Sequence, residues 1–392
     1  MKLKYKKLLN KLIVIGILVL FIIIFSLMKL NENIAEYFYA RGISRAYVFV
    51  VGSLSDLLPF SIFEVFVFLA VLALIISFAV IIKRLVKKQR TEAVSLLEKV
   101  IIAVLVGVLI YTITASGCYY RKELPLPKYQ GEQLSNEKTV EIVDAYLKDF
   151  SDISNSLTYR EDGTSVCPYT FDEINELLIT EYARLDEMDG YFTSYTSHTK
   201  PMLVSEIMSY FGTCGITFMP LGEANINAKT PSCYLTVVMA HELAHTKGVM
   251  REKDANMVAY YLLSSSSIPY FRYCAYMYSI SYLTSVLNVL DRDLYVKSMQ
   301  SYPQKAKIER SRENAYWASK ETFLDSVGEF FNDIYLKLSG VKNGTGNYSD
   351  PSDVTIDKIP SGDTVIEVVK VYYSDTARML IHNAVVNFGI EL

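Results

Sequence analysis

The chain has 392 residues, of which 51% are hydrophobic, and this excess excludes an ordinary soluble globular protein. The formal net charge of −3 is divided unevenly, with +8 in residues 1–120 and −11 in residues 121–392. An acidic C-terminal part without a basic cluster excludes a nucleic-acid-binding function. That part is long enough to bury a core of its own.

Three uncharged apolar runs fall within the first 120 residues. They are Leu12–Met28, Val65–Ile82 and Val100–Tyr120, with 17, 18 and 21 residues. Because about 20 helical residues cross a hydrocarbon core of about 30 Å, we predict spans at about 12–28, 65–82 and 100–117. Buried core helices are the alternative, but they seldom stay uncharged over such lengths. The first run is also compatible with a cleaved signal peptide, yet no small-residue cleavage site follows it, which favours an uncleaved anchor.

The distribution of Lys and Arg predicts the orientation in the membrane. Five basic residues precede the first run, three lie in residues 29–60 and six lie in residues 83–99. Because basic loops stay in the cytoplasm, we expect the N-terminus and residues 83–99 inside, and residues 29–60 and 121–392 outside. The sequence therefore predicts a multi-pass plasma-membrane protein with an extracytoplasmic C-terminal domain.

The chain is accordingly divided into a membrane anchor (1–120), a main domain (121–350) and a C-terminal extension of unknown role (351–392). Residues 29–60 are expected to form an amphipathic outer segment, and Pro125 and Pro127 prevent the third helix from continuing. Apolar spacing predicts helices over 135–150, 171–189, 205–210, 270–300 and 313–338, a strand or hairpin over 211–220 and a loop over 342–347.

Five cysteines are present, so at least one thiol is unpaired within the chain. Cys214 and Cys233 are the best candidates for a disulfide, with two buried free thiols as the equally weighted alternative. No C-x-x-C spacing occurs, which argues against a cysteine zinc site.

The motif His241-Glu242-Leu243-Ala244-His245 is the strongest chemical signal in the chain. On a helix, residues four apart share a face, so His241 and His245 can direct imidazole nitrogens to one Zn²⁺. Glu242 is placed to act as a general base on zinc-bound water. The chain has only four histidines, and His198 and His382 lack a comparable context. Two buried histidines beside a surface glutamate are the structural alternative.

A third zinc ligand is expected on a second helix. We predict a first helix with Ser232 as a candidate N-cap, ending near Gly248, and a second helix from about Glu252 to Leu263. Glu252 is the natural third ligand, and Asn256, on the same helical face, is expected to orient a histidine. Asp254 is the alternative ligand. Arg251 forms either an ion pair or a solvated surface charge.

The pattern H-E-L-A-H-x-x-G-x-x-R-E-x-[DE]-A-N resembles a bacterial family of three-span membrane proteins, catalogued as a domain of unknown function and grouped with the zincin peptidases. The likeness extends to Leu58–Ser61, Gly222–Asn227 and Asn332–Lys337, and covers most of residues 10–350. The E-x-x-A-N element is also similar to the third-ligand element of gluzincin peptidases, which supports Glu252. Lys253 stands where an acidic residue is expected, which puts in doubt only a role for that position.

The resemblance implies a mainly α, zincin-like α+β domain that binds zinc and hydrolyses peptides or membrane-proximal proteins. It suggests that Gly222–Asn227 is an edge strand for extended substrate, with Glu223 meeting a substrate amine; a mere turn is the alternative. For oxyanion stabilisation we consider a tyrosine, and name Tyr335.

Two other functions compete with the peptidase. A non-catalytic envelope receptor or assembly factor would keep the scaffold, but it would not need the general base Glu242. An intramembrane peptidase would need the motif inside a span, whereas Lys229, Lys247 and Arg251 flank it closely.

Overall fold

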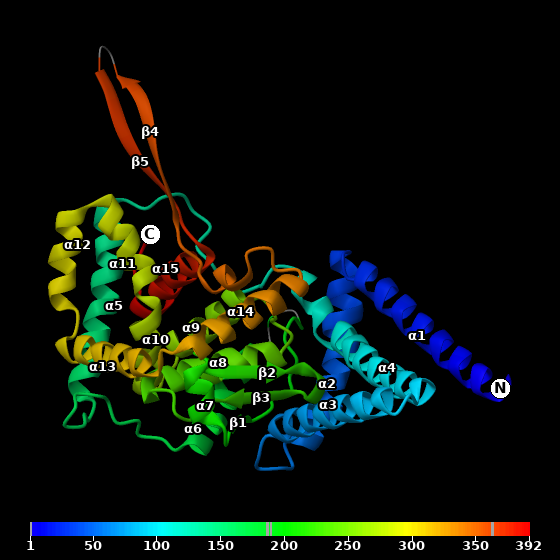
Figure 1. Ribbon diagram of the computed structural model, residues 1–392. Coiled ribbons are helices and arrows are strands. Elements are labelled where there is room, and N and C mark those ends of the chain that lie inside the picture. Colours follow the sequence, from blue (N-terminus) through cyan, green and yellow to red (C-terminus); the bar gives the residue numbers. More distant parts are fainter. Residues whose placement is uncertain (1, 186–187, 189, 362–363) are drawn as a thin grey trace.

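The computed structural model describes residues 2–185, 188, 190–361 and 364–392. Three long helices project from one side of a mainly helical domain (Figure 1). They are α1 (Lys2–Met28), α3 (Ile62–Val86) and α4 (Arg90–Thr114). Each is long and apolar enough to cross a membrane, over Leu9–Met28, Ile62–Val86 and Arg90–Tyr120. The three predicted spans lie inside these candidate spans. The second and third candidates extend beyond both predicted ends, whereas the first begins earlier than predicted and ends at Met28 as predicted.

The segment between the first two spans is helical and packs against the end of the third. It forms a π-helix, η1 (Ile34–Ser44), followed by α2 (Arg45–Ser55). The π-helix lies against η2 (Ser116–Tyr120), the 3-10 turn that continues α4. Its buried residues include a carboxylate, Glu36, so this segment belongs to the packed structure as well as to the membrane anchor.

The rest of the chain forms the main domain. Its α-helices are α5 (Asn136–Ser156), α6 (Phe171–Ala183), α7 (Ser205–Tyr210), α8 (Ser232–Thr246), α9 (Glu252–Ser264), α10 (Pro269–Ser279), α11 (Ser281–Leu290), α12 (Arg292–Ser298), α13 (Gln304–Lys320), α14 (Phe323–Leu338) and α15 (Asp375–Phe388). Short 3-10 turns are η3 (Met219–Leu221), η4 (Met299–Ser301) and η5 (Gly344–Tyr348).

Several predicted helical stretches differ in extent. The stretch over 135–150 continues to Ser156 in α5, and the stretch over 270–300 is divided among α10, α11 and α12. The helix predicted over 171–189 ends at Ala183, and part of its predicted end, residues 186–187 and 189, lies outside the described residues. The stretch predicted over 313–338 is divided between α13 and α14, because the side chain of Thr322 accepts a hydrogen bond from Leu324 N and starts a new helix.

A three-stranded sheet covers one side of α8, in the order β1 (Thr199–Pro201), β3 (Glu223–Ile226), β2 (Gly215–Phe218). Strand β3 is parallel to β1 and antiparallel to β2. The predicted edge strand at Gly222–Asn227 is therefore wrong: β3 is the central strand, and its backbone is paired on both sides. The two edge strands are β1 and β2, and both contact α8.

The C-terminal segment contains a projecting hairpin and a core helix (Figure 1). The hairpin is formed by β4 (Asp353–Ser361) and β5 (Thr364–Tyr372). Helix α15 follows and packs against α5, α9 and α11, with Leu380 and Ile381 in the main hydrophobic core. The segment predicted as an extension thus supplies part of the core of the domain.

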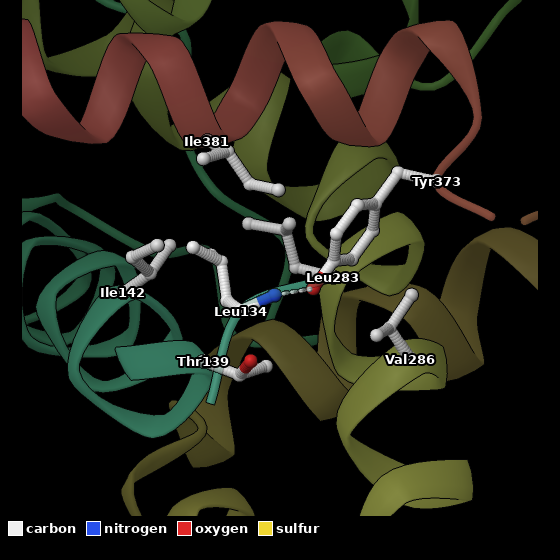
Figure 2. Close-up of a pocket in the computed structure, with 7 residues that line it drawn as sticks. All are labelled: Leu134, Thr139, Ile142, Leu283, Val286, Tyr373 and Ile381. Carbon is white, nitrogen blue, oxygen red and sulfur yellow. Dashed lines mark hydrogen bonds between the residues drawn. The ribbon is translucent and has the colours of Figure 1, made fainter. Parts of the chain in front are cut away.

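Figure 2 shows a small cavity where α5, α11 and α15 meet. Its lining is apolar apart from two hydroxyl groups, and Tyr373 uses its hydroxyl to accept a hydrogen bond from Leu134 N at 3.1 Å. We interpret it as a packing void, since it holds no ionisable group suited to a ligand beyond that satisfied phenol.

All five cysteines are free thiols. Of the two alternatives for Cys214 and Cys233, the disulfide is wrong and the free thiols are confirmed, although Cys214 is only partly buried. Cys233 and Cys274 are both buried. Burial raises the pKa of the Cys233 thiol, and the nearby Cys274 thiol raises it further.

Candidate metal centre

The candidate site is built on two helices joined by a tight turn. Helix α8 ends at Thr246, Gly248 takes φ +83°, and α9 begins at Glu252. The amide of Gly248 donates to the His245 carbonyl at 2.9 Å, which closes the turn. Because a left-handed residue at this point reverses the chain, the start of α9 lies beside the end of α8. The predicted helix–turn–helix is confirmed.

The start of α8 differs by one residue from the prediction. Pro231 holds the N-cap position, and Ser232 is the first helical residue with no side-chain cap. The Pro231 carbonyl already accepts from Leu235 N at 2.8 Å, so the helical ladder begins one residue earlier than expected.

Three buried side chains bring their ligand atoms together. The Nε2 atoms of His241 and His245 are 3.1 Å apart, and Glu252 Oε2 lies 3.2 Å and 3.4 Å from them. Two ligands bonded to zinc at about 2.0–2.1 Å in tetrahedral geometry are themselves about 3.3 Å apart. The separations in this cluster therefore fit one tetrahedral zinc ion with a fourth position left free.

The other ring nitrogens are hydrogen-bonded in the sense that metal binding requires. His241 Nδ1 lies 2.8 Å from Asn256 Oδ1, and His245 Nδ1 lies 2.7 Å from the Val249 carbonyl. Both partners are acceptors, so each Nδ1 carries a proton and each Nε2 offers its lone pair to the cluster. The predicted orienting role of Asn256 agrees with this contact.

Glu252 is the group whose hydrogen bonding is incomplete. Its Oε2 atom is buried and has no hydrogen-bond partner, although its backbone N–H donates to Asn347 Oδ1 at 3.1 Å. Burial alone would raise the pKa of the carboxyl group, but the two histidines lower it. Burial likewise opposes protonation of His245, yet Glu252 raises the pKa of that imidazole. A buried acceptor that lacks a donor, next to two imidazole lone pairs, fits a cation.

Glu242 lies on the adjacent face of α8 and is held by strand β2. Thr217 Oγ1 donates to Glu242 Oε2 at 2.7 Å, and a Cβ at Gly215 would come within 2.5 Å of Glu242 Oε1. Burial raises the pKa of Glu242, and the two histidines partly oppose this. A carboxylate with a raised pKa is better suited to accept and release a proton near neutral pH.

The alternative third ligand points elsewhere. Asp254 accepts from Arg251 Nε at 2.6 Å, and it is not one of the three residues that converge. The predicted ion pair of Arg251 is therefore confirmed, and it accounts for Asp254.

The carboxylate of Glu223 is buried and does not face the candidate site as predicted. It is 1% exposed, and it accepts hydrogen bonds from Lys200 Nζ at 2.7 Å and from Phe63 N at 2.7 Å. It thus joins the central strand to the first turn of α3, and a role in binding a substrate amine is wrong because the carboxylate is already satisfied in the interior.

Two tyrosines lie near Glu252. The Tyr335 hydroxyl is 3.5 Å from that of Tyr119, and burial raises the pKa of Tyr335, with Tyr119 and Glu252 contributing. Tyr348, at the end of η5, lies closer to the metal ligands: its ring is nearly parallel to that of His241, with centroids 6.5 Å apart. The sequence predicts only a loop over 342–347 and does not indicate that Tyr348 lies near His241. The position of Tyr348 depends on the packing of η5 against α14 and α9.

Arg121 links the turn between the two ligand helices to the segment between the first two candidate spans. Arg121 donates to the Gly248 carbonyl at 3.2 Å and, through Nε and Nη2, to Glu36 at 2.9 Å in each case. Burial would raise the pKa of Glu36, but Arg121 and Arg41 keep it below its usual value. Arg121 therefore links the π-helix between the first two candidate spans to the turn between α8 and α9.

The family model described as "Protein of unknown function (DUF3810)" matches residues 39–354, which include the ligand helices and two of the three candidate spans. No curated protein and no solved structure matches the chain.

Proposed function

We propose that this chain, which belongs to the DUF3810 family, is a membrane-anchored zinc metallopeptidase that hydrolyses peptide bonds. The observation that carries the proposal is the convergence of His241 Nε2, His245 Nε2 and Glu252 Oε2, with the Glu242 carboxylate beside them. Three protein ligands with a free fourth position are typical of catalytic zinc sites, whereas structural sites have four protein ligands.

The residues divide into holding and reacting groups. His241, His245 and Glu252 would hold Zn²⁺, which when bound supplies a Lewis acid and lowers the pKa of a coordinated water. Glu242 would take the proton of that water and deliver it to the leaving amine. Thr217 fixes the Glu242 carboxylate by its hydrogen bond, so the base is positioned before substrate binds.

Strand β2 is the surface best suited to an extended substrate. It is the edge strand next to Glu242, and Ile216 on it is 38% exposed. A peptide added to a free edge is held by backbone hydrogen bonds, which suits a peptidase of broad sequence preference. In this proposal β2 takes the substrate-binding role first assigned to Gly222–Asn227.

The proposed location of the site is the extracytoplasmic side of the plasma membrane. The 5:3:6 distribution of basic residues over the N-terminus, residues 29–60 and residues 83–99 supports it. A cysteine introduced at Lys342, an exposed position near Gly344, should react with an impermeant thiol reagent on intact cells. Reaction only after lysis would place the domain in the cytoplasm.

The function is tested on the full chain in detergent, because residues 121–392 alone would lose the contacts of Arg121 with Glu36 and of Glu223 with Phe63. We expect one zinc per chain and cleavage of a peptide library that stops on chelation and returns with zinc. Glu252→Ala should lose both zinc and cleavage, whereas Asp254→Ala should keep both. A protein that binds zinc but cleaves no peptide would favour the non-catalytic scaffold.

A further inference from the structure

Helix α14 carries an apolar stripe that no described residue covers. Its members are Phe323 (76% exposed), Phe330 (60%), Phe331 (63%), Ile334 (37%) and Leu338 (80%). At helical spacing these positions fall within one sector of about 100°, the pattern of a helix with one side in an apolar environment. A stripe of this kind on a monomer marks an interaction surface.

The C-terminal end of α14 is attached to the third candidate span. The hydroxyl of Tyr111 lies 2.6 Å from Ser339 Oγ, and its ring centroid is 5.8 Å from that of Tyr335. Tyr111 lies in the last turn of α4. The stripe therefore begins beside the point where the lipid-exposed surface of α4 ends.

A second apolar patch is attached to the start of the second span. Glu64, in the first turn of α3, accepts from Leu203 N at 2.9 Å and from Val204 N at 2.8 Å. Leu203 is 89% exposed, and Ile207, one turn further along, is 56% exposed. The backbone bonds hold this patch at the level where α3 enters the apolar layer.

Both patches belong to the same side of a membrane. Three candidate spans that cross a membrane in turn place the end of α1, the start of α3 and the end of α4 at one surface. Tyr111 and Glu64 mark that surface at the ends of two different spans. The two patches are thus continuous with the lipid-facing surface of the spans.

We propose that the apolar stripe of α14 and the patch at Leu203 and Ile207 insert into the bilayer that the three spans cross. The occupant is lipid, because both patches are attached to ends of membrane helices and point away from the protein interior. Helix α14 carries three acidic residues, Asp325, Glu329 and Asp333, and one basic residue, Lys337, so its side chains are net negative. Attraction to anionic lipid therefore does not contribute, and a bilayer of neutral phosphatidylcholine suffices. Helix α14 leads into η5, so lipid insertion also fixes the metal ligands close to the bilayer surface.

Tryptophan fluorescence in vesicles tests the insertion and needs no zinc or peptidase activity, so its failure is distinct from failure of the proposed function. The only tryptophan, Trp317, is replaced by Phe, and single tryptophans are introduced as Phe331→Trp and Leu203→Trp. Phe68→Trp, in α3, is the lipid-exposed control, and Val296→Trp, on α12 and 47% exposed, is the water-exposed control. The full chain is reconstituted in phosphatidylcholine with or without brominated acyl chains.

We expect brominated lipid to quench the tryptophans at positions 331, 203 and 68 by about twofold or more, because interfacial apolar faces lie roughly 5–10 Å into the headgroup boundary. The tryptophan at position 296 should be unaffected. If positions 331 and 203 behave like position 296 while position 68 is quenched, the proposal is overturned. The same result together with disulfide cross-linking of a Phe331→Cys variant between copies would show that a second chain covers the stripe, which also overturns the proposal.

Discussion

The amide oxygen of Asn256 lies 2.8 Å from Nδ1 of His241, and it fixes the tautomer in which Nε2 faces Glu252 and His245. The amide nitrogen of Asn256 donates to the Tyr348 carbonyl at 3.1 Å, which settles the orientation of the amide. One side chain of α9 therefore links a ligand on α8 to the segment over the site.

Replacement of Asn256 should weaken metal binding. Because an acceptor on the remote ring nitrogen orients the imidazole, Asn256→Leu should lower zinc affinity about 10–100-fold. Asn256→Asp keeps the acceptor for His241 but loses the donor to the Tyr348 carbonyl, so it should retain more zinc affinity than Asn256→Leu without reaching that of wild type. Competition with a chromogenic chelator measures both; equal affinities for Asn256→Leu and wild type would show that the contact does not matter.

Tyr348 and Tyr335 can be separated by removing one hydroxyl at a time. The Tyr348 ring is nearly parallel to that of His241, and its hydroxyl accepts from Asn332 Nδ2 at 3.3 Å, so we take this hydroxyl as the candidate donor to a developing oxyanion. If it acts in this way, Tyr348→Phe should lower kcat about 10²–10³-fold while zinc stays bound. Tyr335→Phe should change kcat little. The reverse order would restore the role first assigned to Tyr335.

Parts of this site follow from local spacing, and for that reason the sequence predicts them. The four-residue separation of His241 and His245 and the turn at Gly248 depend only on helix geometry and on glycine's access to positive φ. The long apolar runs likewise predict the spans, because hydrocarbon thickness sets their length.

The remaining parts depend on contacts between distant segments. Glu223 is satisfied by groups from α3 and β1, and no local pattern reveals that its carboxylate is internal. Strand order is also nonlocal: β3 becomes central only because Thr199–Pro201 pairs with it across more than 20 residues of chain. The position of Tyr348 over His241 arises in the same way, since η5 is placed by α14 and α9.

Loss of the buried carboxylate at Glu36 should destabilise the protein. Glu36→Gln leaves the Arg121 guanidinium, which is 3% exposed, without its counter-charge. Breaking a buried pair in this way typically costs about 3–5 kcal/mol. We expect a clearly lower thermal unfolding midpoint for the full chain in detergent. Glu32→Gln, an exposed change in the same segment, is the control, and an equal midpoint for the two variants would contradict the account.

His198 should make stability depend on pH. Burial would lower the pKa of its imidazole, but Glu176 at 3.0 Å and Asp56 at 3.5 Å raise it. A folded-state pKa above the unfolded value means that this contribution is fully present below the unfolded pKa of about 6.5, and is lost as pH rises through the folded-state pKa.

The matched comparison is wild type against His198→Gln. The unfolding midpoint of wild type should exceed that of the variant at pH 5.5, and the difference should shrink by pH 8.5. The effect should be small, because the side chains of His198 and Glu176 are 45% and 71% exposed. A difference that grows with pH would show that the carboxylates do not favour the protonated ring.

The central claim is that Glu242 is the general base beside a zinc ion held by His241, His245 and Glu252, and Glu242→Gln tests it most directly. Glutamine keeps the shape and can still accept from Thr217, but it cannot take a proton. Zinc content and peptide turnover are measured on the same preparations of wild-type and variant full chain. We predict one zinc in each, and a loss of turnover of about 10²–10⁴-fold in the variant. Equal turnover in the two proteins, or turnover in neither, would contradict the claim.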